Sequence, residues 1–133
     1  MTRPTIAIST GDPAGVGPEL SLQVAEEVKD RCVPILLGDA RVLRAVAERL
    51  ALPLPSIVDA NNANSLERWE QLGPAPTIVD IPNVGLDQFQ PGTVNPATGQ
   101  ASYDYVTGAI DAFMSHGAVT ANTLMARLET GSG

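Results

Sequence analysis

Hydrophobic and polar positions follow two different periods along this chain. Short apolar runs rich in β-branched residues are typical of buried strands, and they occur at residues 5–9, 33–37, 56–58 and 77–80. Apolar residues that recur every three or four positions predict helices at 18–28, 40–51 and 102–116, with a short helical turn near 66–72. Because strands alternate with helices, we expect an α/β fold: a layered, largely parallel sheet flanked by helices.

Each long helix carries one apolar row that is expected to face the sheet. The rows are Leu20, Val24 and Val28 in the first helix, Val42, Val46 and Leu50 in the second, and Val106, Ile110, Phe113 and Met114 in the third. Pro18 suits a first helical turn because its missing N–H would be unpaired there. Gly117 is placed to end the third helix as a C-cap.

The predicted strands at 56–58 and 77–80 are separated by the polar residues 59–64 and the short helical turn. Residues 81–99 contain Pro82, Gly85, Pro91, Gly92, Pro96 and Gly99, which is typical of an extended, punctuated connection. The regular elements therefore lie between residues 1 and 116, which we expect to form a partial α/β domain.

Composition narrows the class of protein. With 133 residues and 44% hydrophobic residues, the chain can bury one core. Eight Lys and Arg residues against fifteen Asp and Glu residues give a net charge of -7, which argues against a nucleic-acid partner. No apolar run approaches the roughly 18 residues of a membrane span, and the first residues lack the features of a signal peptide. We therefore expect a cytoplasmic protein with no membrane partner.

Single cysteine and histidine residues limit the chemistry. Because Cys32 is the single cysteine, the chain cannot form an intrachain disulfide. With His116 as the single histidine, it cannot build a Cys/His zinc site of its own. Cys32 precedes an apolar strand and is expected to be a small buried residue, since no base lies near it in sequence. His116 is expected at the surface, interacting with a helix C-terminus.

Four further side chains were candidates for chemistry and are expected to be structural. Asp104 and Asp111 lie two turns apart on one predicted helix and favour a solvated face over a carboxylate pair. Tyr103 and Tyr105 are expected to be packing residues.

The most informative segment is the strand–loop–helix sequence GDPAGVGPEL at residues 11–20. Three glycines within seven residues let the backbone approach a phosphate or nucleotide at a helix N-terminus. The spacing fails the G-x-G-x-x-G fingerprint, because Leu20 stands where the third glycine is needed, and no phosphate-loop lysine follows. The only lysine, Lys29, is expected at the far end of the helix. From spacing alone, a ligand loop and a simple tight turn both remain open.

Loop geometry leads to a separate expectation about the glycines. Valine at Gly15 or Gly17 would destabilise the fold by roughly 1 to 3 kcal/mol if the native residue has φ above zero. The Asp12 carboxylate is expected to accept hydrogen bonds from loop N–H groups.

Two motifs together resemble a known family. GDPAGVGPEL at 11–20 and PGTVNPATGQASYDYVTGAIDA at 91–112 look like the amino-terminal part of 4-hydroxythreonine-4-phosphate dehydrogenases. The first motif is also similar to the G-D-G-I-G-P-E segment of isocitrate and isopropylmalate dehydrogenases, whose fold that family shares. The resemblance runs from about Thr5 to Ala112 and implies part of that dehydrogenase-like fold.

The resemblance implies an activity that the residues alone do not establish. Family members oxidise 4-phosphohydroxy-L-threonine with NAD at a divalent metal such as zinc, magnesium or cobalt, and the product then loses carbon dioxide, in vitamin B6 (pyridoxine) biosynthesis. They are homodimers with the site between two domains of each subunit. By this resemblance Val16 would pack on the cofactor, Gly15 and Gly17 would admit it, and Asp12 would belong to the same cofactor-binding loop.

The chain also departs from the family. A T-x-P-x-x-K strand and a G-H-T-E phosphate-binding motif should follow the helix at 102–116, and neither is present. The family's three histidine metal ligands are absent, so no metal ligand or catalytic residue is carried over. Residues 117–133 form a tail that is only faintly similar to a later G-P-x-x-A-D-T-x-F segment, with Asn122 at the place of the Asp. We therefore expect a truncated or internally deleted, inactive version of the enzyme.

Two alternatives remain open. Within enzymes, the chain could derive from a related dehydrogenase of phosphorylated sugar acids such as threonate or erythronate. Outside enzymes, it could be a noncatalytic α/β module that binds a nucleotide or a partner surface.

Overall fold

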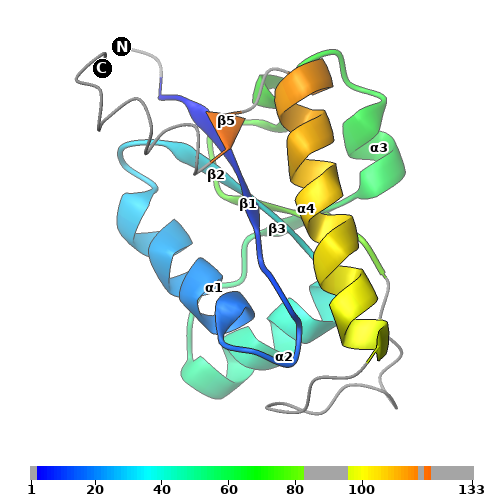
Figure 1. Cartoon of the computed structure of the whole chain (residues 1–133). Coiled ribbons are helices and arrows are strands. Elements are labelled where there is room, and N and C mark those ends of the chain that lie inside the picture. Colours follow the sequence, from blue (N-terminus) through cyan, green and yellow to red (C-terminus); the bar gives the residue numbers. More distant parts are fainter. Residues whose placement is uncertain (1–2, 83–95, 117–118, 121–133) are drawn as a thin grey trace, which may run out of the picture.

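The computed structural model describes residues 3–82, 96–116 and 119–120 (Figure 1). Within these ranges strands and helices alternate along the chain. Their order is β1 (Thr5–Ser9), α1 (Gly17–Val28), β2 (Val33–Gly38), α2 (Ala40–Leu50), β3 (Ser56–Asp59), α3 (Ala60–Asn64), the 3-10 helix η1 (Trp69–Leu72), β4 (Thr77–Asp80), α4 (Pro96–His116) and β5 (Val119–Thr120).

One parallel sheet organises the molecule. Its strands lie in the order β3-β4-β2-β1-β5, and each neighbouring pair is parallel. The strand β2 is central and buried along its whole length, which explains why its sequence VPILLG is apolar throughout rather than alternating. The predicted α/β layer fold is confirmed, with strands at 5–9, 33–37 and 77–80 in a common sheet.

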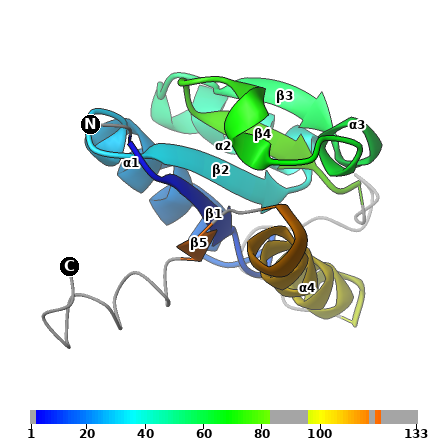
Figure 2. The same cartoon turned by 90° about the horizontal axis from the view of Figure 1, so that it is seen from above.

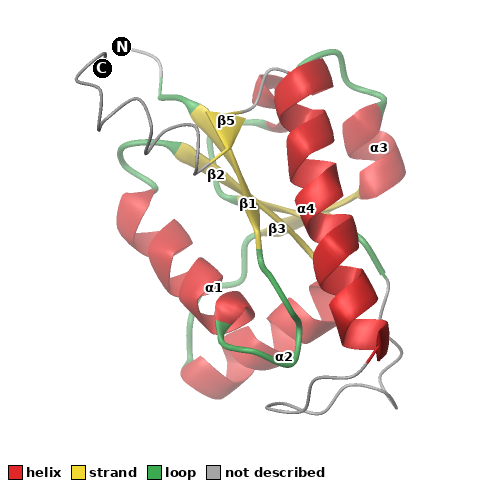
Figure 3. Cartoon of the chain, in the orientation of Figure 1, coloured by secondary structure: helices red, strands yellow, loops and turns green. Residues whose placement is uncertain are grey.

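Helices cover both faces of this sheet (Figures 2 and 3). On one face, α1 and α2 pack on Leu36 of β2 and Ile78 of β4. On the other face, α3, η1 and α4 pack on alternate residues of the same strands, including Ile35 and Val79. Successive strand residues point to opposite faces, so each central strand contributes to both cores.

The apolar rows expected to face the sheet are wrong for α1 and α4. Leu20 and Val24 are 53% and 42% exposed, whereas Leu22 and Ala25 are buried. Among the described side chains of α4, Ala101, Tyr105 and Ala109 are buried, whereas Val106, Ile110 and Met114 of the expected row are exposed. The side chain of Phe113 lies outside the described ones. Both helices carry apolar residues on two sides. The side that faces the sheet combines alanines, which let the helix lie close, with one large buried side chain, Leu22 in α1 and Tyr105 in α4. In α2 the expected Val42 and Val46 are buried.

Two further boundaries differ from expectation. The helix α4 begins at Pro96 rather than near 102, and proline fits the first position of a helix. The polar stretch 59–64 contains the helix α3, for which no element was predicted, and the Asp59 carboxylate caps it by accepting a hydrogen bond from the Asn61 N–H at 2.9 Å. The expected C-cap Gly117 and most of the expected connection at 81–99 lie outside the described residues.

The strand β5 extends the sheet beyond the expected domain. Val119 and Thr120 pair with Ile6 and Ala7 of β1, so two residues of the segment 117–133 belong to the sheet. None of the helices in the described ranges has the length and apolar character needed to cross a lipid bilayer.

Candidate functional site

The glycine loop lies at the carboxyl edge of the sheet. It follows β1, and the ends of β2 and β4 reach the same edge because all three strands are parallel. Thr10 joins the loop to β2, since its backbone N–H and its hydroxyl both donate to the Leu37 carbonyl, at 3.1 and 3.0 Å. In open parallel sheets, ligands bind beyond the carboxyl ends of the strands.

Two glycines let the backbone close up around Thr10. A Cβ at Gly17 would lie 2.0 Å from the Thr10 carbonyl oxygen, and a Cβ at Gly38 would lie 2.5 Å from the Thr10 hydroxyl oxygen. Neither position accepts a side chain without movement of its neighbours. The first turn of α1 is therefore held directly against the end of β1.

Gly15 and Gly17 do not have positive φ, so the condition attached to the expected effect of valine is not met. Among described glycines only Gly11 and Gly73 have positive φ, at 75° and 109°. Gly17 is needed for close approach, whereas a Cβ at Gly15 would meet only the Asp12 carbonyl oxygen at 3.4 Å. Glycine spacing in the sequence does not distinguish these two causes.

The Asp12 side chain shapes the loop, as expected. Its Oδ1 accepts a hydrogen bond from the Ala14 N–H at 2.8 Å, and its carbonyl oxygen accepts one from the Gly15 N–H at 2.9 Å. Both bonds close a tight turn that carries the chain from β1 to α1.

Val16 lies at the tip of this turn, where α1 begins. It is the N-cap residue of α1, no side chain caps the helix, and Pro18 follows in the first turn. The Val16 side chain is 67% exposed. An apolar side chain next to uncapped helix N–H groups can contact a flat, partly polar ligand. The loop thus brings together Asp12, Gly15, Val16 and Gly17.

Asp39 and Asp80 occupy the ends of β2 and β4 and were not singled out in the sequence. The buried Asp39 carboxylate accepts hydrogen bonds from the Arg41 backbone N–H at 2.9 Å and from its guanidinium Nε and Nη2 at 3.1 and 2.8 Å. These bonds raise the pKa of the Arg41 guanidinium. Asp80 Oδ1 accepts from the Ala40 N–H at 2.8 Å. Both carboxylates hold the first turn of α2, and the position of Asp39 directly before an amphipathic helix is a sequence signal for such a cap.

Tyr105 is buried below this edge. Its hydroxyl lies against the backbone of Asp39 without a well-aligned hydrogen bond to the described residues. Burial raises the pKa of this phenol, and the nearby Asp39 carboxylate raises it further. The expected packing role is confirmed for Tyr105 but is wrong for Tyr103, which is 65% exposed.

The remaining candidates lie away from the loop. Cys32 is buried, and burial raises the pKa of its thiol, which makes it a poor nucleophile at neutral pH. Lys29 ends α1 on the far side and pairs with Glu26, Nζ to Oε1, at 2.6 Å. Asp104 accepts a hydrogen bond from Gln100 at 3.0 Å on a solvated face. His116 is the last residue of α4, and its side chain lies outside what the structure describes.

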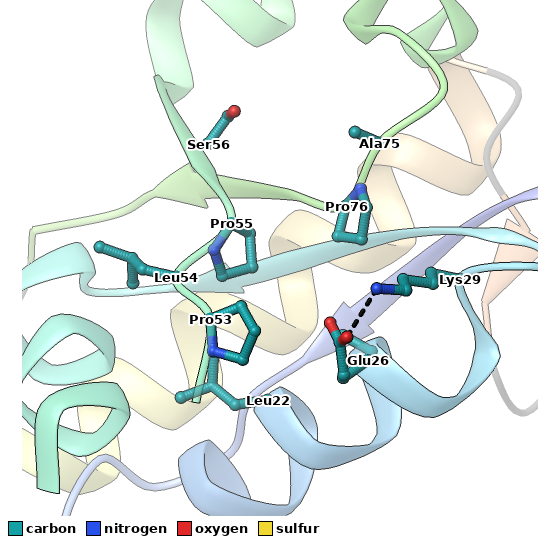
Figure 4. Close-up of a pocket in the computed structure, with 10 residues that line it drawn as sticks. Leu22, Glu26, Lys29, Pro53, Leu54, Pro55, Ser56, Ala75 and Pro76 are labelled. Atoms are coloured by element: carbon teal, nitrogen blue, oxygen red, sulfur yellow. Dashed lines mark hydrogen bonds and ion pairs between the residues drawn. The ribbon is translucent and has the colours of Figure 1, made fainter. Parts of the chain in front are cut away.

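One pocket of about 230 Å³ opens at the opposite edge of the sheet (Figure 4). It is lined by the end of α1, including the Glu26–Lys29 pair, and by the prolines Pro53, Pro55 and Pro76 that precede β3 and β4. This pocket is therefore at the amino ends of the strands and is separate from the glycine loop.

Metal ligands are not gathered in the described ranges. No group of three or more His, Cys, Asp or Glu side chains there is arranged to hold a metal ion.

Comparisons with known proteins connect this loop to a family of dehydrogenases. No protein-family model matches the chain. A Clostridium botulinum protein assigned as a D-threonate 4-phosphate dehydrogenase is 31% identical over 115 residues, which are 82% of this chain and 32% of that protein. The solved 4-hydroxythreonine-4-phosphate dehydrogenase of Burkholderia phymatum has a TM-score of 0.66 at 26% identity, over 84% of this chain and 33% of that one. The resemblance to the 4-hydroxythreonine-4-phosphate dehydrogenase family is confirmed.

The similarity covers only part of these dehydrogenases. The chain spans about a third of the length of the curated relatives that it matches. A terephthalate 1,2-cis-dihydrodiol dehydrogenase of Burkholderia xenovorans has the same fold over 83% of this chain and 30% of its own, with a TM-score of 0.60 and 28% identity. The relatives are thus dehydrogenases that differ in the substrates for which they are named.

Proposed function

We propose that this chain is the cofactor-loop part of an NAD-dependent dehydrogenase that acts on a phosphorylated hydroxy acid. The observation that carries the proposal is the loop at residues 11–17, whose exposed Val16 stands at an uncapped helix start on the carboxyl edge of a parallel sheet. NAD would supply the hydride acceptor. In this proposal Val16 packs on the cofactor, Gly15 leaves room for it, and Gly17 and Asp12 fix the backbone that presents them.

Charge indicates which part of the dinucleotide meets the loop. Asp12 and Glu19 place carboxylates on either side of Val16, and residues 11–20 contain no Lys or Arg. The free N–H groups at the start of α1 would attract a pyrophosphate, but the two carboxylates oppose that attraction and no Lys or Arg of the loop adds to it. The uncharged contact made by Val16 suits the nicotinamide and ribose end.

The substrate proposal follows the names of the relatives. Those names specify D-threonate 4-phosphate and 4-hydroxythreonine 4-phosphate, which are both phosphorylated hydroxy acids. We favour 4-phosphohydroxy-L-threonine and keep D-threonate 4-phosphate as the alternative. The divalent metal implied by the family requires ligands beyond those described here, so no step is assigned to it.

Titration with NAD tests the loop assignment. Val16→Asp adds a carboxylate where the nicotinamide end would pack and should weaken NAD binding at least about tenfold, as measured by calorimetry. Val24→Asp is the matched control, because Val24 is also an exposed valine of the α1 region but lies two turns away. Equal affinities of the two variants, or no NAD binding by the parent chain, would contradict the assignment.

A further inference from the structure

The pocket at the amino ends of the strands has walls built largely from proline (Figure 4). Pro53 and Pro55 stand before β3, and Pro76 stands directly before β4. Leu22 and Ala25 of α1 also line the pocket and are buried, at 3% and 2% exposed. Proline rings fix their own φ angles and carry no N–H, so these walls are apolar and need little ordering when a ligand binds.

Hydrogen bonds hold these walls in place. The Arg3 guanidinium donates to the Lys29 carbonyl oxygen at the end of α1 and, at 2.7 Å, to the Pro74 carbonyl oxygen in the segment before β4. The Leu52 N–H donates to the Ala47 carbonyl oxygen at 2.9 Å, which fixes the chain where it leaves α2. Each of the three segments that surround the pocket is thus anchored without a ligand.

A pair of opposite charges from α1 lies in the pocket. Lys29 Nζ is 2.6 Å from Glu26 Oε1, and the two side chains are 43% and 40% exposed. The hydrogen bond to Glu26 raises the pKa of Lys29, so the ammonium group stays charged at neutral pH. An ion pair exposed to this extent contributes little to stability, so a ligand can replace either partner at small cost.

This charge pair favours a ligand that carries both charges. A lone anion would be attracted by Lys29 and repelled by the adjacent Glu26, and a lone cation would meet the opposite balance. An α-amino acid carries an ammonium group and a carboxylate on one carbon atom, so it can satisfy both side chains together. The pocket volume of about 230 Å³ lies below the roughly 300–1,000 Å³ of drug-sized sites and limits the ligand to a small molecule.

We propose that this pocket binds a small aliphatic α-amino acid. Its ammonium group pairs with Glu26 and its carboxylate pairs with Lys29, while its side chain packs on Leu22 and the proline walls. The site lies at the opposite end of α1 from the glycine loop, so it does not depend on whether NAD binds.

Titration with L-leucine tests the site. The 133-residue chain, labelled with ¹⁵N, is followed by two-dimensional NMR while L-leucine is added. We expect saturable shifts at the amides around the pocket, with a Kd of about 10 mM or tighter, as ordinary ligand efficiencies give for a molecule of this size. The analogue 4-methylpentanoate lacks the ammonium group and 3-methylbutylamine lacks the carboxylate. Each should bind at least about tenfold more weakly than L-leucine.

Charge-removing variants locate the contact. Glu26→Gln and Lys29→Gln each delete one charge of the pair and should each weaken L-leucine binding at least about tenfold. Glu27→Gln is the matched control, because Glu27 is an exposed carboxylate of the same helix that does not line this pocket, and it should bind L-leucine with the affinity of the parent chain. Far-UV circular dichroism should be the same for the parent chain and the three variants, since all three side chains are at the surface.

Any of three results would overturn the proposal. One is the absence of saturable shifts around the pocket up to about 50 mM L-leucine. Another is equal binding of L-leucine and of either singly charged analogue, which would show that the ion pair does not recognise both charges. The last is undiminished binding by both Glu26→Gln and Lys29→Gln. None of these readouts involves NAD, so each is separable from a failure of the proposed function.

Discussion

Gly17 and Gly15 show how two residues of one type in one loop have different roles. A Cβ at Gly17 would overlap the Thr10 carbonyl oxygen, whereas a Cβ at Gly15 would make an ordinary contact with Asp12. Gly17→Ala should therefore destabilise the fold by about 1–3 kcal/mol, and Gly15→Ala should change it by less than about 0.5 kcal/mol. Urea unfolding midpoints measure the difference. Equal midpoints would show that the backbone at Gly17 moves without cost.

Tyr105 predicts an alkaline limit to stability. Burial raises the pKa of its phenol in the folded chain, so the folded state disfavours the phenolate, whereas the unfolded chain ionises near pH 10. The stabilising contribution is complete below pH 10 and is lost as the pH rises above that value. In the variant Tyr103→Phe, Tyr105 is the sole tyrosine. Its phenolate absorbance at 295 nm should appear together with the loss of far-UV circular dichroism. Ionisation of a chain that is still folded would contradict this prediction.

Single-residue roles were predictable where the cause is local in sequence. Asp12 accepts a hydrogen bond from an N–H two residues later, and the Asp-Pro-Ala sequence is sufficient to predict such a turn. Tyr103 and Tyr105 are two residues apart, and their opposite environments depend on which side of α4 meets the sheet. The orientation of α4 is set by tertiary packing, and the sequence around either tyrosine does not determine it.

At the scale of elements, the two aspartate caps differ in what they hold. Asp39 is buried and binds both the backbone and the guanidinium of Arg41, whereas Asp59 caps the short, largely exposed α3. Asp39→Ala should cost about 2–3 kcal/mol, and Asp59→Ala about 0.5–1 kcal/mol. Chemical denaturation followed by Trp69 fluorescence would compare them. Asp39→Asn, which keeps a capping oxygen but loses the charge, should fall between the parent and Asp39→Ala.

The positions of strands and long helices could be predicted from period, but the faces of α1 and α4 could not. Periodicity locates an apolar row, and each of these helices has a second row that combines alanines with one large side chain, Leu22 or Tyr105. The row that faces the sheet is the one that lets the helix lie closest to it, and Ala25, Ala101 and Ala109 allow this close approach. In α2 no second row competes, and Val42 and Val46 were placed correctly.

For the whole molecule, we predict that the chain alone has no dehydrogenase activity. Oxidation of a phosphorylated hydroxy acid at a metal requires several metal ligands and groups that hold the phosphate. The sequence offers one histidine and one lysine, and Lys29 lies at the opposite end of α1 from the loop. Association with a second copy would add the same set again. Formation of NADH from NAD, a divalent metal and 4-phosphohydroxy-L-threonine above a no-protein control would refute this prediction.

Of the whole candidate site, only the glycine loop at residues 11–17 could be predicted from the sequence. The motif at 11–20 gives the loop and its place after β1, because strand, loop and helix are contiguous. Asp39, Asp80 and Tyr105 come together at the same edge from three distant elements. Their proximity is created by the strand order, which sequence period does not specify.

Pairing between β1 and β5 has a consequence for the order in which the chain folds. Thr5 meets Val33 after a short excursion, but Ile6 meets Val119 across a segment about four times as long. Each doubling of a closed loop costs about 0.6 kcal/mol of chain entropy. Closing the loop between β1 and β5 therefore costs about 1.2 kcal/mol more than closing the loop between β1 and β2, and it forms only two residue pairs. The sheet should therefore grow outward from β1 and β2, with β5 joining last. In native-state hydrogen exchange its amides should exchange before those of β2, which makes β5 the point at which the fold begins to open.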